Sequence, residues 1–281
     1  MSALRFILEL GEPGYPQLLA ETPDPPKRLY GLGRPSALRP GLAIIGSRKA
    51  TPYGLRCARQ FAGWAGSAGV TIISGAAIGC DSEAHRAALG AGGPSVAVLG
   101  CGPDVDYPRR SADVLRMMRT EHAVISELPF GMQPTRWSFV RRNRIIAGLA
   151  RAVLVVEAGL PSGTFSTADA ALDAGRDVLA VPGSILSAES RGANRLIRQG
   201  AIPVTDIAEL AITLGIEGVL STVGETDPKD AAMRALAADP LRPDDFARTL
   251  GIDIVSAART LGRLESSGAI VRYPDGRYGL G

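Results

Sequence analysis

Residues 42–54 read LAIIGSRKATPYG, an apolar run that ends in a Gly-Ser-Arg turn and leads through Thr-Pro into a helical stretch. The run LAIIG is short, rich in β-branched residues, and continuous rather than alternating. That pattern is typical of a strand buried on both faces of a parallel sheet. The stretch after the turn carries apolar residues at helical spacing as far as a glycine-containing turn, which suits a helix end. The segment therefore predicts one strand–loop–helix unit.

The same unit recurs along the chain. Further apolar runs are separated by helical patterns, such as TADAALDAGR at 167–176. Strands that alternate with helices form a parallel sheet covered on both faces. We therefore predict an α/β fold, a Rossmann-like doubly wound parallel sheet, with further strands at 70–74, 95–100, 123–127, 152–158, 177–183 and 202–205.

The regions flanking this sheet differ in composition. Residues 1–35 are rich in proline and predict a leader of little regular structure that packs on the main domain at 36–214. A Gly/Ser/Thr/acidic stretch at 215–228 is typical of a linker. Residues 229–281 predict a small winged-helix domain: helical patterns at 229–238, 243–250 and 253–268, then a strand, a Pro-Asp-Gly turn and a returning strand.

Composition excludes several classes of protein. The 281 residues are 46% hydrophobic, which supports a real core. The apolar runs are far shorter than the roughly 18–20 residues of a membrane span, and the N-terminus lacks a signal-peptide pattern, so we expect a cytoplasmic protein without membrane contact. Cys57, Cys80 and Cys101 are an odd number at wide spacing, which predicts reduced structural thiols rather than disulfides or a metal site.

Three strand-end loops carry glycine and hydroxyl groups. Ligands of open α/β sheets bind beyond the carboxyl ends of the strands, and backbone N–H groups at a helix start favour phosphate. Gly46-Ser47-Arg48 therefore predicts an anion site, with a plain tight turn as the alternative. Ser74-Gly75 marks a second possible pocket loop, for which tight helix–strand packing competes. The third loop, 161–167, contains Gly163 and Thr164.

None of these loops matches a known nucleotide-hydrolysis signature. The first lacks both the G-x-G-x-x-G fingerprint and the Walker A pattern, so ATP hydrolysis has no support. The two histidines offer little: His85 is predicted to be a core or capping residue and His122 a loop residue. No clustered metal ligands, CxxC pair or nucleophile elbow occurs in the sequence. We expect a binding protein without metal or cofactor rather than an enzyme.

A charge run suggests the ligand. Residues 136–151 hold five arginines and no acid, which favours an anionic partner over the alternative of a solvated helix face. Within RWSFVRRNR at 136–144, guanidinium groups alternate with aromatic rings, a mixture that suits single-stranded nucleic acid because unpaired bases stack on rings. Phe139 is the better stacking candidate, and Trp137 is interpreted as core.

Five ordered motifs resemble one family, the DNA-processing protein A (DprA/Smf) family, over roughly residues 12–205. They are GSRKATPYG, SGAAIGCDSEAH, RRNRIIAGLA, SGTFSTADAALDAGRDVLAVPG and SRGANRLIRQGA. The resemblance implies a homodimer of natural transformation that binds and protects incoming single-stranded DNA and helps load the RecA recombinase. It implies no turnover.

The resemblance also implies site residues. The family's G-[ST]-R motif matches Gly46, Ser47 and Arg48, its basic residue matches Arg136, and its stacking aromatic matches Phe139. Arg136 stands where relatives often have lysine, and Ser111 stands where an asparagine is expected. The complete predicted DNA-binding set is Gly46, Ser47, Arg48, Arg136, Phe139, Arg142, Asn143, Arg144, Gly163 and Thr164.

Two other functions remain as alternatives. The fold also resembles nucleotide-monophosphate phosphoribohydrolases, whose P-G-G-x-G-T signature is followed by acids. Here PSGTFST places Ser166 and Thr167 at those positions, so the groups that assist glycosidic cleavage are missing. The second alternative is a regulator that binds duplex DNA through the winged helix, using Arg259 and Arg263 on one helix face.

Overall fold

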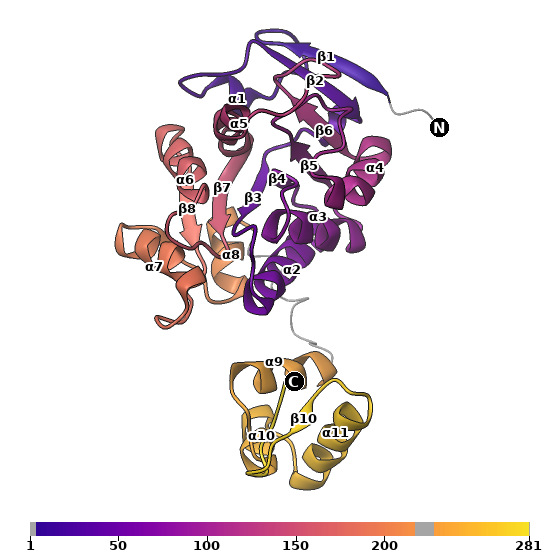
Figure 1. Ribbon diagram of the computed structural model, residues 1–281, viewed down its shortest axis with the longest axis vertical. Coiled ribbons are helices and arrows are strands. Elements are labelled where there is room, and N and C mark those ends of the chain that lie inside the picture. Colours follow the sequence, from indigo (N-terminus) through magenta and orange to yellow (C-terminus); the bar gives the residue numbers. More distant parts are fainter. Residues whose placement is uncertain (1–3, 217–227, 281) are drawn as a thin grey trace. The chain divides into compact units, whose positions relative to one another are not determined.

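The computed structural model describes residues 4–216 and 228–280, which fall into two compact units, Met1–Glu217 and Gly218–Gly281 (Figure 1). Each unit is described by itself. Most of the linker predicted at 215–228 lies outside the described residues, and the predicted domain boundaries stay a prediction.

A nine-stranded sheet forms the centre of the first unit, in the order β1-β2-β6-β5-β4-β3-β7-β8-β9. The seven strands from β6 to β9 in that order are parallel, and β1 and β2 are antiparallel. The Rossmann-like prediction is therefore confirmed. The strands are β1 Arg5–Glu9, β2 Arg28–Gly33, β3 Gly41–Ile45, β4 Ile72–Ser74, β5 Ser95–Val98, β6 Ala123–Ser126, β7 Ala150–Val155, β8 Asp177–Ala180 and β9 Ile202–Pro203.

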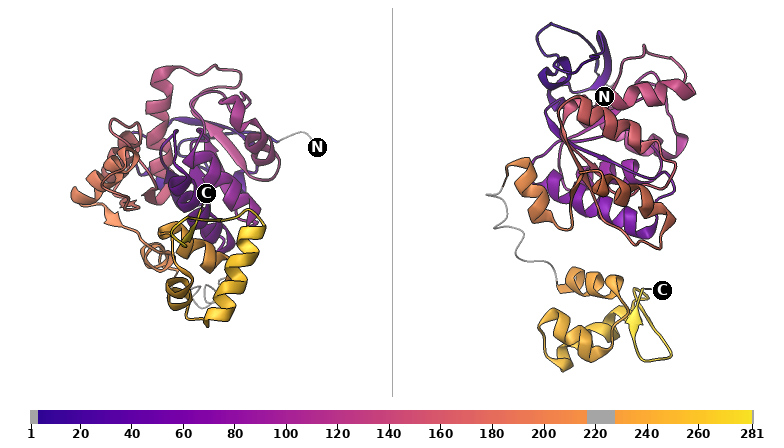
Figure 2. Two further views of the ribbon diagram at one scale, coloured as in Figure 1. Left: turned by 60° about the horizontal axis from the view of Figure 1, so that its bottom comes forward. Right: turned by 90° about the vertical axis from the view of Figure 1, so that its left-hand side faces the viewer.

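Helices cover both faces of this sheet (Figure 1 and Figure 2). One face packs on α2, α3 and α8, with α4 over β5 and β6, and the other face packs on α1, α5, α6 and α7. The helices are α1 Gln17–Ala20, α2 Pro52–Ser67, α3 Cys80–Gly90, α4 Ala112–Glu121, α5 Arg136–Leu149, α6 Thr164–Asp173, α7 Arg191–Arg198 and α8 Ile207–Leu214, with short 3-10 turns η1 Pro35–Ala37, η2 Arg109–Ser111 and η3 Ala188–Ser190.

Burial on both faces explains the continuous apolar runs. In β3, Leu42 and Ile44 pack against the helices of one face, whereas Ala43 and Ile45 pack against those of the other. All four are at most 4% exposed. A strand with no solvent face needs apolar residues at every position, because each side chain enters one core or the other.

The strand order reverses between β3 and β7. After β3 the chain adds β4, β5 and β6 on one side, and α5 then returns it to β7 on the other side of β3. The two strands pair in parallel, Leu42 with Ala152 through Ile45 with Val155. Loops that leave β3 and β7 in opposite directions open a crevice at their carboxyl ends, which is where open α/β sheets bind ligands.

The leader is more regular than its composition predicts. The prediction that the leader has little regular structure is wrong. Strand β1 pairs with β2, and β2 extends the sheet by pairing antiparallel with β6. Five of the leader's six prolines lie between residues 13 and 26, in the connection between the strands, and the sixth, Pro35, follows β2. The strand segments RFILE and RLYGLG contain none, so every N–H group in them can enter the ladder.

The second unit contains three helices and a short antiparallel hairpin, at the positions that the sequence predicts. They surround a core that includes Phe246, Leu261 and Leu264. Its assignment to the winged-helix class stays a prediction. The elements are α9 Pro228–Ala238, α10 Pro243–Leu250, α11 Ile254–Ser266, β10 Val271–Arg272 and β11 Tyr278–Gly279. Across both described ranges, no helix is long and apolar enough to cross a membrane.

Candidate nucleic-acid interface

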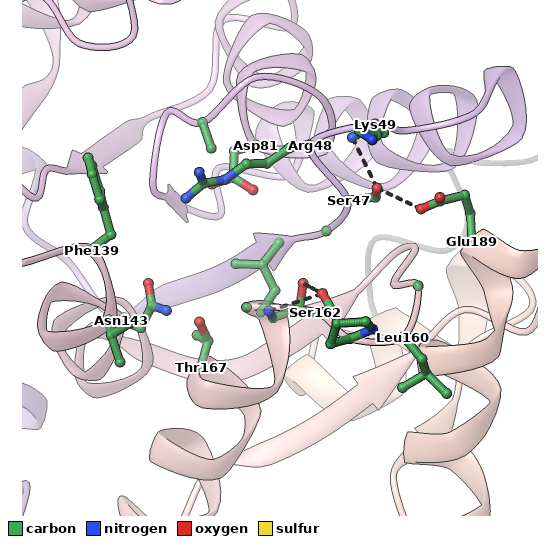
Figure 3. A pocket seen from close by; sticks show the side chains of 18 of the residues that line it. Ser47, Arg48, Lys49, Asp81, Phe139, Asn143, Leu160, Ser162, Thr167 and Glu189 are labelled. Atoms are coloured by element: carbon green, nitrogen blue, oxygen red, sulfur yellow. Dashed lines mark hydrogen bonds between the residues drawn. The ribbon is translucent and has the colours of Figure 1, made fainter. Parts of the chain in front are cut away.

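A cavity of about 570 Å³ lies at the point where the strand order reverses (Figure 3). Its walls come from the loop after β3, the loop after β7, the first turns of α5 and α6, and Glu189 of η3. The first and third of the loops predicted from sequence therefore meet in one site. Figure 3 labels Arg48, Phe139, Asn143 and Thr167 among the side chains around it.

The Gly46–Arg48 loop is held in place by two acidic residues that sequence reasoning missed, Glu157 through its backbone carbonyl and Glu189 through its carboxylate. The backbone N–H of Ser47 donates to the backbone carbonyl of Glu157 at 2.7 Å, and its hydroxyl donates to Glu189 Oε2 at 3.0 Å. Gly46 has no room for a side chain, because a Cβ there would lie 2.6 Å from Cys80 Sγ. Glycine at this position is required by close packing on α3, which leaves Ser47 and Arg48 to face a ligand.

Glu157 fixes the start of α2. Its side chain is 2% exposed and accepts hydrogen bonds from the Thr51 backbone N–H at 2.8 Å and the Thr51 hydroxyl at 2.6 Å. The Thr51 hydroxyl in turn accepts from the Gly54 N–H at 3.2 Å, as a helix N-cap does. The only signal of this role in the sequence is an acid directly after an apolar strand.

Arg48 and Phe139 approach each other across the cavity wall. The Arg48 guanidinium carbon lies 5.7 Å from the centroid of the Phe139 ring. Arg48 is exposed and makes no ion pair with any residue in the described part of the chain. A free guanidinium beside an aromatic ring offers one group for a phosphate and another for a base.

Phe139 is positioned by a second ring that the sequence analysis did not single out. Tyr107 stacks on it, with centroids 5.2 Å apart and 29° between the planes. Behind it, a Cβ on Gly100 would lie 2.8 Å from Phe139 Cδ1, so the glycine leaves room for the ring. Tyr107 is 40% exposed, which extends the aromatic surface beyond the cavity.

Arg142 is a buried residue that stabilises the site by hydrogen bonds to strand ends. It is 5% exposed, and its Nη1 donates to the carbonyls of Gly75, at 2.8 Å, and Val98. Burial lowers the pKa of Arg142 to about 10, so it keeps its charge at neutral pH. Burial likewise raises the pKa of the nearby Asp81 carboxyl, although the Arg142 charge opposes that rise. Both groups line the floor of the cavity.

Ser74 and Gly75, in the second predicted loop, are closely packed at the end of β4. Ser74 is fully buried and its hydroxyl donates to the Ile44 carbonyl at 2.6 Å. A Cβ on Gly75 would lie 2.4 Å from Arg142 Nη1. Neither residue lines the 570 Å³ cavity. Gly75 lines a smaller pocket of about 80 Å³ together with Arg48, Phe139 and Arg142. Close packing accounts for the buried Ser74, and the part of this loop in binding stays a prediction.

Arg144 is not brought to the cavity. It forms ion pairs with Glu127 at 2.6 Å and with Asp24 at 2.8 Å, and its side chain is only 18% exposed. Two carboxylates distant in sequence balance its charge, and its inclusion in the predicted DNA-binding set stays a prediction. Arg136, the first residue of α5, is exposed but lies outside the cavity lining. The core interpretation of Trp137 is wrong, since that ring is 52% exposed.

The remaining predicted residues connect α5 with α6. Asn143 lines the cavity, and its Nδ2 donates to the Ser166 hydroxyl at 2.8 Å. Gly163 and Thr164 line it at the start of α6, where the Thr164 N–H donates to the Ser162 hydroxyl at 3.2 Å. The backbone N–H groups of this helix start add a second region of positive potential opposite Ser47.

His85 is a core residue, as the sequence predicts. It is fully buried, and its Nδ1 lies 2.8 Å from the Ser95 hydroxyl, which donates to the Ile72 carbonyl. Since that hydroxyl proton is engaged, Nδ1 carries the ring proton, and Nε2 has no partner. Burial lowers the pKa of His85 to about 3. The ring is therefore neutral at physiological pH and lies outside the cavity lining.

Two strand-end loops of a kind that favours phosphate meet at the switch point of a Rossmann-type sheet, beside an arginine and an aromatic ring. This arrangement defines an α/β protein of the nucleotide- or nucleic-acid-binding class. The comparison with family models is more specific. Residues 6–215 match the family described as DNA recombination-mediator protein A, and the chain belongs to this family. The resemblance inferred from the five motifs is confirmed.

Individual relatives agree with this assignment. The chain is 40% identical to "Protein Smf" of Escherichia coli K12 over 275 residues, which cover 93% of this chain and 73% of that protein. The X-ray structure of DNA processing protein A from Streptococcus pneumoniae aligns with a TM-score of 0.70 at 38% identity, covering 74% of this chain and 73% of that one.

A second solved structure names a ligand. DNA processing protein A from Helicobacter pylori aligns with a TM-score of 0.68 at 29% identity, over 76% of this chain and 98% of that one. That protein has a single-stranded DNA binding mode described as unique.

Proposed function

We propose that this protein binds single-stranded DNA at the switch-point cavity, with a phosphate on the Gly46–Arg48 loop and a base on Phe139. One observation carries the proposal. The exposed Arg48, which makes no ion pair with a described residue, has its guanidinium carbon 5.7 Å from the centroid of the Phe139 ring. A duplex hides the faces of its bases, so a site built from a phosphate loop and a stacking ring favours an unpaired strand. The single-stranded DNA named for the Helicobacter pylori relative supports the same ligand.

The residues of the site have distinct roles in this proposal. Ser47, Arg48 and the start of α6 at Gly163 and Thr164 hold phosphate, and Asn143 offers an amide to a base or sugar. Arg142 positions the other residues of the site: its hydrogen bonds to the carbonyls of Gly75 and Val98 hold the cavity floor. Arg136 extends the positive surface at the rim. The protein releases no product in this proposal and acts as a binder, not an enzyme.

The test is binding of a fluorescent thymidine oligomer followed by anisotropy. Arg48→Ala and Phe139→Ala should each weaken binding by about 5- to 150-fold, the range for loss of a charge contact or a stacked base. Arg48→Ala should also lower the slope of log affinity against log salt by about 0.7, and Phe139→Ala should leave it unchanged. The matched control is Arg151→Ala, an exposed arginine at the opposite, amino end of β7.

Unchanged affinity in both variants, with thermal unfolding like that of the wild type, would reject the site. Stronger binding of a duplex than of the single strand would favour the duplex-regulator alternative, in which Arg259 and Arg263 of α11 contact DNA. Release of free base from a nucleoside monophosphate would favour the phosphoribohydrolase alternative.

We further propose that the protein acts in natural transformation, as a homodimer that protects incoming single strands in the cytoplasm and helps load RecA onto them. The family description as a recombination mediator supports this role. Static light scattering tests the dimer. RecA loading is tested by the rate of filament assembly on a single strand covered by a single-strand-binding protein. The wild type should speed assembly, and Arg48→Ala should not.

A further inference from the structure

Helix α5 exposes a large apolar strip beside the cavity. Trp137 is 52% exposed and Val140 is 60% exposed. Residues three apart on a helix are neighbours on its surface, so the two side chains form one strip on the first turn of α5. Val140 also lines the cavity. The strip therefore begins at the edge of the site and runs from Val140 to Trp137.

The strip lies among arginines. Arg136 is exposed and makes no ion pair with a residue of the described ranges. The Arg141 guanidinium carbon lies 6.0 Å from the Trp137 ring centroid. Arg141 does pair with Glu127, but that carboxylate is shared with Arg144. The arginines at 136, 141 and 144 thus carry three positive charges, against the two negative charges of Glu127 and Asp24. The surface around the strip keeps a net positive charge.

Helix geometry sets the path between the two rings. Phe139 and Trp137 are two residues apart, about 200° around the helix, so Trp137 does not share the cavity with Phe139. Arg136 and Val140 lie between them on the helix surface. A polymer that leaves Phe139 along this face therefore passes Arg136 and Val140 before it reaches the Trp137 ring.

We propose that Trp137 is a second stacking platform, which holds the base of a nucleotide outside the cavity, while Arg136 holds the phosphate between the two bases. The inference rests on the proposed binding of single-stranded DNA at Phe139. Its support is the continuity of the strip with the cavity and the positive charge around the ring, which together fit an anionic chain with aromatic bases. The platform makes the site longer than one pocket.

The chain contains only two tryptophans, which makes the test direct. Trp64 lies in α2 with its ring nitrogen buried, so Trp64→Phe leaves Trp137 as the single fluorescent reporter. Titration of that variant with a thymidine oligomer of about 20 nucleotides should quench the fluorescence, because a stacked base contacts the ring. A thymidine trinucleotide, short enough to be held by the cavity alone, should quench it far less.

Affinity gives the second readout. Trp137→Ala should weaken binding of the long oligomer by about 5- to 150-fold, the range that base stacking supplies, and leave the trinucleotide unaffected. Trp137→Phe should retain most of the affinity. Ile212→Ala, which removes another apolar side chain that is 58% exposed, is the matched control and should change neither.

The outcomes separate this inference from the function on which it rests. If Phe139→Ala weakens both ligands while Trp137→Ala weakens neither and the reporter is not quenched, Trp137 is not a platform but the cavity site stands. If neither substitution affects either ligand, both proposals fail. The platform is supported if Trp137→Ala loses affinity for the long oligomer but not for the trinucleotide, and if the long oligomer quenches the Trp137 fluorescence.

Discussion

Replacement of Glu189 by glutamine should strengthen the binding of single-stranded DNA. In the free protein, the Glu189 carboxylate accepts a hydrogen bond of 3.0 Å from the Ser47 hydroxyl. Ser47 lies in the loop where we propose that a phosphate binds. Glu189 makes no ion pair with a described residue, so its charge stays directed at the cavity. A carboxylate beside an incoming phosphate opposes it, and glutamine removes the charge while it keeps an acceptor for Ser47.

The size of the effect follows from the distance. A phosphate oxygen bound to the Ser47 hydroxyl would lie about 2.7 Å from it, which brings the two anions to within about 5 Å of each other. At that separation two unit charges repel by about 0.8 kcal/mol in water and about 3 kcal/mol at an effective dielectric constant of 20. Glu189 is half-buried, so we take about 1 kcal/mol, a gain in affinity of about fivefold.

The assay is anisotropy with a labelled thymidine oligomer at several salt concentrations. The gain should shrink as salt rises, because ions screen the repulsion. Glu121→Gln, which removes an exposed charge at the end of α4, is the control for net charge and should have a smaller effect. Equal or weaker binding by Glu189→Gln at low salt would refute a phosphate at Ser47. A gain of affinity cannot result from misfolding.

Two further predictions concern stability. Gly75→Ala places a Cβ 2.4 Å from Arg142 Nη1 and should lower the free energy of unfolding in urea by about 1–3 kcal/mol, whereas Gly163→Ala, whose Cβ meets nothing within 4 Å, should change it little; equal effects would contradict the packing role of Arg142. His85 has a folded-state pKa of about 3 against 6.5 unfolded, so the unfolded chain binds the proton first as pH falls. The wild type should therefore lose stability from about pH 6.5 downward, by at most about 1.4 kcal/mol per pH unit from this residue. A His85→Asn variant should show a shallower loss, and parallel pH profiles would show that His85 contributes nothing.

Much of the fold follows from local pattern. Seven strands and their connecting helices lie where apolar runs and helical spacing predict them. The strands β3 to β8 are mostly buried, and burial on both faces leaves an unbroken apolar signature. The leader strands β1 and β2 were missed. Both are short; β1 pairs with β2, and β2 pairs with β6, a partner about 100 residues away. Pairing at that separation leaves little mark on local composition.

The sequence by itself indicated the loop after β3, the loop after β7, Arg48, Phe139 and the family, since each is recognised from residues close together in the chain. That these loops meet, and that Arg48 faces Phe139, was decided by the fold. Tertiary structure alone decided what the charges do. Arg142 and Arg144 look alike in the sequence, yet one is buried against strand-end carbonyls and the other is paired with Asp24 and Glu127. Glu189 reaches Ser47 across 142 residues of chain. The physical reason is that a charge acts through whichever groups folding brings within a few ångströms, and spacing along the chain does not specify those partners.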